Sequence, residues 1–414
     1  MNKCTSEVEN VNKSCLCKTL DKEVLFKVLG DSPLLKDLIQ ERPNLFSNVA
    51  IFLSQEEVKQ IQNTIFAIEE IIQGPAFQKK VLENTSEVAR MDFGTKGVFM
   101  GYDFHLTEDG PKLIEINTNA GGAFLNLILA KAQHSCCSGA VFPIELDKVQ
   151  DSLFDIFMKE WRLQRKDQSL KVIAIMDENP TEQYLYPEFE LFSKLFKEKG
   201  INIFILDPRL IEHKEGALWF ENTKIDLIYN RSTDFYFENG VYSKIRDAYL
   251  GNEVVITPNP HHHALYADKE NLEIFTSVNE LDSLKVSTKT KELLLKGIPR
   301  TIKMTEANRS DLWSQRRDYF FKPSKGYGSK ATYRGDKLTH KVWEEMRLSR
   351  YVAQRLALPG IRIIEKDGKE LELKQDIRAY SYDGEVILFA SRLYSGQTTN
   401  FRTTGGGFAA VFVI

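Results

Sequence analysis

The sequence predicts a protein of the α/β class with additional α+β elements, and three observations carry this prediction. Between residues 170 and 265, the strand-like runs KVIAIMD, INIFILD and KIDLIYNR alternate with an amphipathic helical run that ends at Gly200. This alternation is typical of a parallel sheet. Residues 20–90 carry apolar side chains at helical spacing. Two pairs of β-forming runs, separated by TEDGP and by Asp383-Gly384, predict antiparallel hairpins.

The composition is that of an ordinary globular protein. The chain has 414 residues, enough for two or three domains with a large core. A formal net charge of −3 argues against binding to nucleic acid or a membrane surface through bulk positive charge. No apolar run has the length of a transmembrane helix, and the polar start lacks the apolar core of a signal peptide. We therefore expect a cytoplasmic protein with neither nucleic acid nor membrane as partner.

The N-terminal segment is polar and contains three of the five cysteines. An odd number of cysteines in a long chain does not predict a disulfide framework. Cys15 and Cys17, with Cys4, could bind a metal, but a CxC pair without a second cluster favours a frayed, reduced terminus. Residues 1–20 are therefore expected to be disordered.

Further helices and strands are expected on both sides of the α/β unit. Ser54 and Glu57 have the spacing of a capping box at the start of a helix. The hairpin around residues 98–118 comes next, and the helical runs AFLNLILAKAQ and DKVQDSLFDIFMKEWRLQRK lead into the α/β unit. The glycines of that unit do not form a GxGxxG fingerprint, which disfavours a dinucleotide site. From about Asp268 a helix-forming segment precedes DYFFKPSKGYGSKATYRG and three strand-like runs.

The first hairpin presents three hard oxygen donors. Side chains alternate along a strand, so Glu115 and Asn117 share a face. If the loop spans residues 107–111, Asp103 lies opposite Glu115. These oxygens suit Mg²⁺ shared with substrate phosphates. Taken alone, a surface hairpin with its polar side in water is the more frequent explanation.

The run FFKPSKGYGSKATYR has the composition of an anion-binding loop. Glycines at positions 326 and 328 let backbone N–H groups approach phosphate oxygens, and Lys322, Lys325 and Lys330 add positive charge. No GxxxxGK[ST] motif occurs, so this is not a Walker loop. A plain hairpin is the alternative.

The run QDIRAYSYDGEVILFASRLYSGQTTNFRTTGGG contains the third candidate group. Asp376 and Arg378 share a strand face, and Arg392, Asn400 and Arg402 follow. Arginines of fixed charge suit bidentate binding of phosphate or carboxylate. Exposed strand charges beside a flexible triple-glycine turn are the alternative.

Together these stretches resemble the ATP-grasp carboxylate–amine ligases, which include glutathione synthetases, D-alanine–D-alanine ligases and ribosomal-protein glutamate ligases. DIRAYSYDGEV is similar to the family's DxR strand, and GYDFHLTEDGPKLIEINTNAGG to the segment whose E-x-N pair holds Mg²⁺. ADKENLEIF and FFKP resemble the segments with the two nucleotide lysines, here Lys269 and Lys322. YVAQRLA resembles the hinge whose backbone pairs with adenine, here Gln354, Arg355 and Leu356.

The order of these motifs implies a circular permutation. In most of the superfamily the E-x-N strand follows the DxR strand, whereas here it lies far ahead of it, as in eukaryotic glutathione synthetases. The phosphate loop departs from those enzymes, because Gly326 stands near the place of an acidic metal ligand. The implied fold is a permuted ATP-grasp domain with an inserted Rossmann-like α/β domain. Its expected parts are a disordered terminus (1–20), the permuted C-terminal part with the Mg²⁺ site (21–165), the α/β substrate domain (166–267) and the ATP-binding part (268–414).

The resemblance implies an ATP-dependent ligase that joins a carboxylate, of an amino acid or peptide, to an amine through an acylphosphate. One or two Mg²⁺ ions would be held by Asp103, Glu115 and Asn117. The phosphates would be contacted by Lys269, Lys322 and the loop residues Gly326, Tyr327, Gly328 and Ser329. The acylphosphate would be stabilised by Arg378 and Arg402, with Arg392 and Asn400 in support. A kinase-like member or an inactive nucleotide-binding regulator are the alternatives, and a homodimer is the default assembly.

Two further groups precede the ATP-binding part. Asn230, Arg231 and Asp234 follow a strand of the parallel sheet, at the edge where such sheets present a ligand crevice. They are candidate substrate contacts. The residues His261, His262 and His263 are expected in a loop, where consecutive side chains diverge and do not form a metal site.

Overall fold

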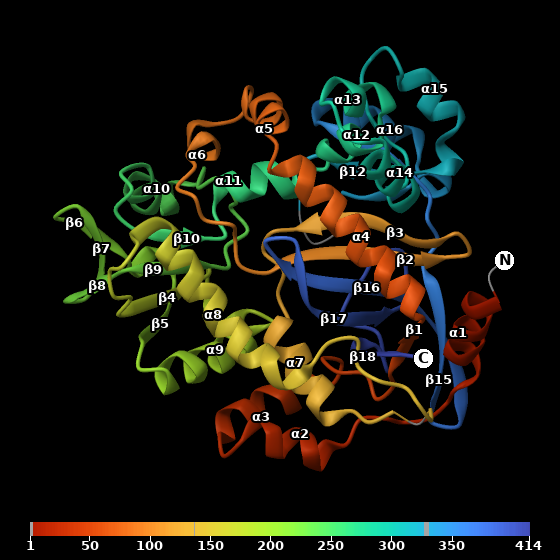
Figure 1. Ribbon diagram of the computed structural model, residues 1–414, viewed down its shortest axis with the longest axis horizontal. Coiled ribbons are helices and arrows are strands. Elements are labelled where there is room, and N and C mark those ends of the chain that lie inside the picture. Colours follow the sequence, from red (N-terminus) through yellow and green to blue (C-terminus); the bar gives the residue numbers. More distant parts are fainter. Residues whose placement is uncertain (1–2, 136, 327–330) are drawn as a thin grey trace.

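A large, mainly antiparallel sheet forms the centre of the computed structural model, which describes residues 3–135, 137–326 and 331–414 (Figure 1). The strand order is β1-β18-β17-β16-β2-β3, with β15 beside β16, and only the β1–β18 pair is parallel. The strands are β1 (Ile51–Leu53), β2 (Met100–Thr107), β3 (Gly110–Asn117), β15 (Gly360–Lys366), β16 (Lys369–Tyr382), β17 (Glu385–Tyr394) and β18 (Gly407–Val413). Both predicted hairpins, β2–β3 and β16–β17, are therefore confirmed.

Helices cover both faces of this sheet. Helix α4 (Gln55–Ile72) packs on one face, where its apolar side meets Phe104, Ile377 and Phe389. The predicted capping box begins this helix, since Ser54 Oγ accepts from Glu57 N at 3.2 Å and Glu57 accepts from Ser54 N at 2.7 Å. Helices α7 (Ala123–Ala132) and α8 (Leu146–Arg165) pack on the other face. The side chains of Asp103 and Arg378 lie on that second face, between flanking core residues that point towards α4.

The predicted parallel sheet lies beside α8 (Figure 1). Its order is β10-β9-β4-β5, and all of its pairs are parallel. Helix α9 (Tyr186–Glu198) follows β4 and ends just before Gly200, whose φ is +79°. The unit comprises β4 (Val172–Met176), β5 (Asn202–Leu206), β9 (Leu227–Asn230), β10 (Val255–Thr257), α10 (Ser243–Leu250) and the small sheet β6 (Glu212–Lys214), β7 (Ala217–Phe220) and β8 (Thr223–Ile225).

A small antiparallel sheet of order β11-β14-β12-β13 forms the third part, with short helices around it. Its strands are β11 (Thr301–Lys303), β12 (Tyr319–Pro323), β13 (Tyr333–Arg334) and β14 (Tyr351–Arg355). Its helices are α12 (Asn271–Thr276), α13 (Val278–Ser283), α14 (Thr288–Gly297), α15 (Arg309–Ser314) and α16 (His340–Glu345). The remaining helices are α2 (Lys22–Leu29), α3 (Pro33–Gln40), α5 (Pro75–Leu82), α6 (Glu87–Arg90) and α11 (Pro260–His262).

Residues 3–20, which were expected to be disordered, are instead ordered against the large sheet. Helix α1 (Lys3–Ser14) packs on β1 and β15. Asn12 Nδ2 donates to Phe52 O at 2.9 Å, and Phe52 N donates to Asn12 Oδ1 at 3.0 Å. The fully buried guanidinium of Arg362 donates to Asn12 O at 2.9 Å and to Cys15 O at 2.5 Å. Tertiary contacts therefore order a segment whose composition alone favours disorder.

The three consecutive histidines are also not in a loop. They span the end of α11 and the start of a π-helical turn, His263–Ala267, and all three are buried. Each ring contacts a different part of the chain: His261 contacts Ala89 O, His262 contacts Thr95, and His263 contacts Thr118 Oγ1. In the described ranges, no three His, Cys, Asp or Glu side chains are placed to hold a metal ion.

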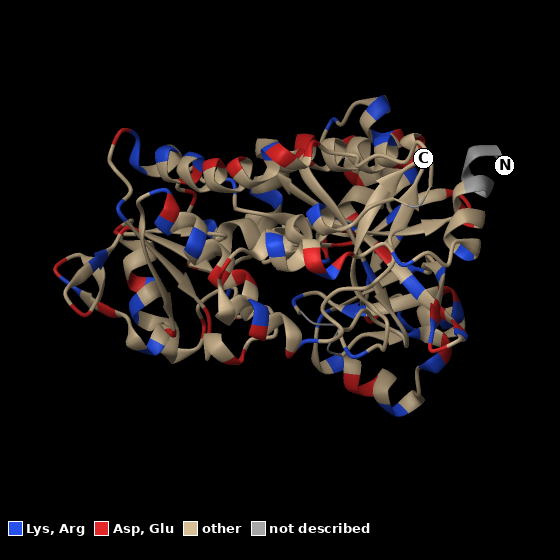
Figure 2. Cartoon of the chain, turned by 90° about the horizontal axis from the view of Figure 1, so that it is seen from below, with Lys and Arg blue, Asp and Glu red and all other residues tan. Residues whose placement is uncertain are grey.

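The surface carries both signs of charge. Lys and Arg are interspersed with Asp and Glu over the helices and loops, as the nearly balanced composition leads one to expect (Figure 2). Across the described residues, no helix has both the length and the apolar character needed to span a bilayer.

Candidate active site

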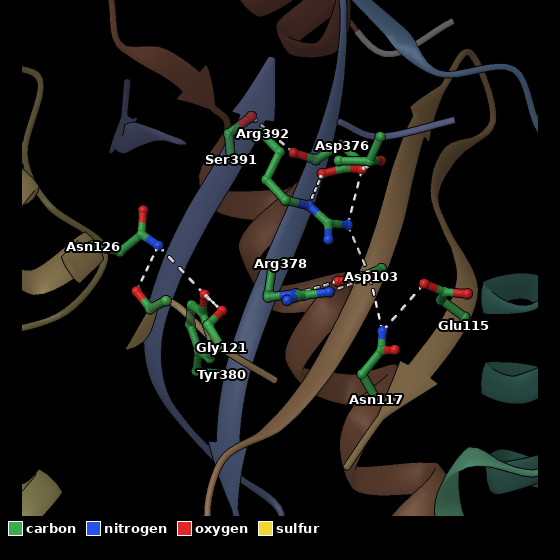
Figure 3. A network of polar contacts seen from close by, with 12 residues as sticks. Asp103, Glu115, Asn117, Gly121, Asn126, Asp376, Arg378, Tyr380, Ser391 and Arg392 are labelled. Carbon is green, nitrogen blue, oxygen red and sulfur yellow. Dashed lines mark hydrogen bonds and ion pairs between the residues drawn. The ribbon is translucent and has the colours of Figure 1, made fainter. Parts of the chain in front are cut away.

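The hairpin β2–β3 brings its three oxygen donors together, as the strand alternation predicts. Asp103 pairs with Glu115, and Asn117 lies two residues further along β3. Asn117 Nδ2 donates to Asp103 Oδ2 at 3.0 Å and to Glu115 Oε1 at 3.2 Å (Figure 3). The amide nitrogen therefore links the two carboxylates.

Asp103 is held by two arginines from the other end of the chain. Strand β2 pairs with β16, which places Arg378 directly opposite Asp103. Arg378 donates from Nε to Oδ1 at 2.6 Å and from Nη2 to Oδ2 at 2.7 Å, and Arg392 Nη2 lies 2.8 Å from Oδ2 (Figure 3). Burial alone would raise the pKa of the fully buried Asp103, but the two guanidinium groups outweigh it and lower the pKa.

Asp376 extends this network on the far side of Arg392. It accepts from Arg392 Nε at 2.8 Å and from Nη2 at 2.9 Å, and Thr399 Oγ1 donates to it at 2.6 Å. A buried row of side chains with alternating charge therefore runs from Asp376 through Arg392 and Asp103 to Arg378. Such pairing fixes both guanidinium groups with little freedom of rotation.

The network changes what Asp103 can do. Its Oδ2 atom already accepts from Arg378, Arg392 and Asn117, and its Oδ1 atom accepts from Arg378 Nε. Asp103 also lines neither of the cavities described below, whereas Glu115 and Asn117 line both. Asp103 therefore positions the two arginines, and of the three predicted metal ligands only Glu115 and Asn117 line the cavities.

The first cavity lies between the small sheet and the large one and has a volume of about 810 Å³, including its open mouth. It brings together most of the predicted nucleotide and metal residues and one predicted catalytic residue, Arg392. The nucleotide and metal residues are Glu115, Asn117, Lys269, Lys322, Gly326, Gln354, Arg355 and Leu356. Tyr327, Gly328 and Ser329 lie outside the described residues.

Two lysines enter this cavity. Lys322 Nζ donates to Ile114 O at 2.7 Å and to Gln354 Oε1 at 2.8 Å, and Lys269 Nζ donates to Gly326 O at 3.1 Å. Burial lowers the pKa of Lys322 to about 8; Lys269 acts in the same direction, and Glu115 opposes it. Both lysines therefore line the same cavity as the Glu115 carboxylate.

The hinge after β14 offers fewer free backbone groups than its resemblance implies. Arg355 N already donates to Arg300 O at 2.8 Å, and Leu356 N donates to Asp318 O at 2.9 Å. The backbone N–H of Ala357, which also lines the cavity, makes no hydrogen bond to a described residue. The first free donor of the hinge is thus at Ala357, beyond the predicted residues.

A second cavity, of about 1,080 Å³, lies against the first. It is shared between the sheet face around Arg378 and the edge of the α/β unit. Its charged lining consists of Arg231, Lys269, Arg378 and Arg392 against the single carboxylate of Glu115. Glu115, Asn117, Lys269, Gly326, Arg392 and Thr399 line both cavities.

One of the three predicted substrate contacts reaches the second cavity. Arg231 lines it, is 8% exposed, and forms no ion pair with a described carboxylate. Asn230 is instead buried and donates to Pro258 O at 3.3 Å, and Asp234 accepts from the backbone of Glu238 and Asn239. Those two residues shape the loop.

The structure does not bring Arg402 and Asn400 to the site. Arg402 is exposed and lines neither cavity. The side chain of Asn400 bonds within its own loop, to Ser395 O at 2.9 Å and to Arg402 N at 2.9 Å. Their loop neighbours Thr399 and Phe401 line the second cavity instead. Neither side chain therefore lines a described cavity, and the catalytic role expected of Arg402 and Asn400 stays a prediction.

The sequence prediction missed two contributors to the site, His105 and Thr399, and also the contact between Asp376 and Arg392. His105 lies two residues after Asp103 on the same strand face, and the alternation that selected Asp103 could have selected it. Asp376 was identified with Arg378 on its strand, but its hold on Arg392 depends on the β16–β17 register. Thr399 has no local signal, because its hydrogen bond to Asp376 depends on the path of an irregular loop.

Comparison with known proteins identifies the fold. No protein-family model and no curated sequence matches the chain. The chain has the ATP-grasp fold and resembles ATP-grasp ligases, as its motifs predict. A glutathione synthetase-like effector from Globodera pallida, in its apo form, aligns with a TM-score of 0.57 and 11% identity over 95% of this chain and 97% of that one. A putative γ-glutamylcysteine synthetase from Methylobacillus flagellatus aligns with a TM-score of 0.49 and 10% identity, over 86% and 87%.

Proposed function

We propose that this protein is an ATP- and Mg²⁺-dependent ligase that joins a carboxylate, of an amino acid or peptide, to an amine through an acylphosphate. The observation that carries the proposal is the common wall of the two cavities. A nucleotide in the first cavity and a carboxylate in the second would meet at Glu115, Asn117, Lys269 and Arg392. Positioning of two reactants at such a wall is the main task in phosphoryl transfer.

The first cavity suits the polyphosphate of ATP. Lys269 and Lys322 supply positive charge, and the Arg392 guanidinium, fixed by Asp376, points into the same space. Phosphate oxygens are acceptors only, so they require donors of this kind. The phosphate contacts predicted for the anion-binding loop, Gly326 to Ser329, belong to the same proposal.

Glu115 and Asn117 fit a Mg²⁺ ion. Both are half-buried hard oxygen donors on the common wall, and Glu115 keeps one carboxylate oxygen free of hydrogen bonds to described residues. Mg²⁺ is usually bound through one or two carboxylates together with substrate phosphates, so two protein ligands suffice. When bound, the ion would neutralise phosphate charge during transfer.

The second cavity suits an anionic substrate. Its excess of arginine and lysine favours a carboxylate, and Arg231 supplies a buried guanidinium that no described carboxylate pairs with. Arg378 and Arg392 would stabilise the acylphosphate and the tetrahedral species formed when the amine attacks. The amine nitrogen then forms a bond to the carbonyl carbon, the bond from that carbon to the phosphate oxygen breaks, and the amine loses one proton as inorganic phosphate leaves.

We also propose that the chain is circularly permuted. Ile414 N donates to Leu53 O at 3.0 Å, where β18 runs parallel to β1 and α4 begins two residues further on. A chain that continued from Ile414 into α4 and then the hairpin would have the usual motif order. The proposed functional division at residues 165 and 267 follows from that order.

The test measures ADP and phosphate release with Mg-ATP against a panel of amino acids and short peptides, with mass spectrometry of the products. Glu115→Ala should abolish turnover and leave the unfolding temperature unchanged. Glu372→Ala, an exposed carboxylate on β16, is the matched control and should retain full activity. Phosphorylated product without an amide would indicate a kinase. ATP binding without turnover on any substrate would indicate a regulatory protein and refute the ligase.

A further inference from the structure

His105 lines the first cavity, and its ring nitrogen Nε2 makes no hydrogen bond to a described residue. It lies on β2, where Phe104 packs into the core towards α4 and His105 faces the cavity. The cavity floor beside it consists of the hinge residues Gln354 to Ala357.

The tautomer of His105 follows from its single described contact. Nδ1 lies 2.6 Å from Ala357 O. A carbonyl oxygen only accepts, so the hydrogen resides on Nδ1. Burial lowers the pKa of His105, although the carbonyl contact and Asp376 oppose this. The imidazole is therefore neutral near pH 7 and Nε2 carries a lone pair.

No described residue donates a hydrogen bond to that lone pair, and Nε2 is not fully enclosed by protein atoms. The amide NH₂ of Gln354, which lines the same cavity, instead donates to Thr301 Oγ1 at 3.4 Å. A phosphate has only acceptors and cannot use Nε2. The donors of a nucleotide are its sugar hydroxyls and the exocyclic amino group of its base, and these belong to the nucleoside.

We propose that His105 recognises the nucleoside part of the bound nucleotide, with Nε2 accepting a hydrogen bond from a ribose hydroxyl or from the adenine amino group. This inference rests on the proposed ATP site. The Nδ1–H group of His105 also donates to Ala357 O, which links the hinge to the central sheet. The same ring would therefore couple the position of the hinge to nucleoside recognition.

Two substitutions separate these contacts. His105→Asn keeps a donor near the place of Nδ1 and removes the acceptor, whereas His105→Gln keeps a polar atom near the place of Nε2. His134→Phe alters an exposed histidine and is the control. Binding of Mg-ATP, 2′-deoxy-ATP, 3′-deoxy-ATP and purine riboside triphosphate, which lacks the amino group, is measured by calorimetry.

In the wild type, one of the three analogues should bind about five- to tenfold more weakly than ATP, the value of one neutral hydrogen bond. That analogue identifies the donor. In His105→Asn, the affinity for ATP should fall to that of this analogue, so the difference between the two affinities should vanish. His105→Gln and His134→Phe should retain the difference. An equal penalty in the wild type and in His105→Asn would overturn the inference.

The wild-type series remains decisive even if a His105 variant does not fold. Equal affinity of the wild type for ATP and all three analogues would overturn the inference on its own while leaving the ATP site intact. Failure of the wild type to bind any of the four nucleotides would instead overturn the proposed function, and the inference with it.

Discussion

Replacing Asp103 by asparagine should destabilise the fold strongly, because Asp103 is the central anion of the buried network. The side chain is fully buried and accepts four hydrogen bonds between 2.6 and 3.0 Å from Arg378, Arg392 and Asn117. The amide of the substituted side chain would place an NH₂ group among these donors. The substitution would also leave the two buried guanidinium groups with a single ion pair to a described carboxylate, that of Arg392 with Asp376. Removal of one partner from a buried ion pair costs about 3–5 kcal/mol.

Urea unfolding followed by far-UV circular dichroism measures this loss. At a slope of about 3 kcal/mol per M, the midpoint should fall by roughly 1 M or more. Asp367→Asn, at an exposed turn between β15 and β16, is the control and should stay within about 0.5 kcal/mol of the wild type. Because folding lowers the pKa of Asp103, its contribution is complete above the unfolded pKa of about 4 and is lost progressively as the pH falls from there through the folded value. The difference should therefore be constant from pH 6 to 8. An Asp103→Asn midpoint equal to that of Asp367→Asn would refute the reasoning.

Two further predictions concern the lysine of the cavity and the N-terminal helix. Lys322 has a pKa lowered to about 8, so it is protonated at pH 7 and loses its charge as the pH rises through 8. Mg-ATP affinity, measured by calorimetry, should fall over pH 7–9, and Lys322→Met should weaken binding about tenfold or more at pH 7 and remove this pH dependence; a Met variant with the wild-type profile would contradict it. Asn12→Ala removes both hydrogen bonds to Phe52 and should raise amide exchange throughout α1, with Lys13→Ala as the exposed control; exchange equal to the control would show that α1 is held by other contacts.

The elements that the sequence predicts correctly are those that depend on residues close together in the chain. The β2–β3 and β16–β17 hairpins follow from period-two patterns around strong turns, and the capping box at Ser54 follows from two residues three apart. The pairing of Asp103 with Glu115 is a consequence of the short loop. The parallel sheet of residues 172–257 is likewise encoded in short buried runs separated by a helix.

The parts that were missed depend on contacts between distant segments. Asp103 looks like a metal ligand on its own hairpin, but its state is decided by the pairing of β2 with β16, which brings Arg378 opposite it. Helix α1 has little apolar surface of its own and is ordered by Arg362, which lies 350 residues further along the chain than Asn12. Arg402 has the residue type and the motif spacing of a catalytic arginine, but spacing does not determine the direction in which an irregular loop turns its side chains.

The central claim is that Mg-ATP and a carboxylate meet at the wall formed by Glu115, Asn117, Lys269 and Arg392. Transfer of ¹⁸O from an ¹⁸O-labelled carboxylate substrate to released phosphate tests it most directly, because an acylphosphate passes one carboxylate oxygen to phosphate. The account predicts one ¹⁸O per phosphate for the wild type and for Glu372→Ala, and no turnover for Glu115→Ala. Unlabelled phosphate released together with an amide product would contradict it.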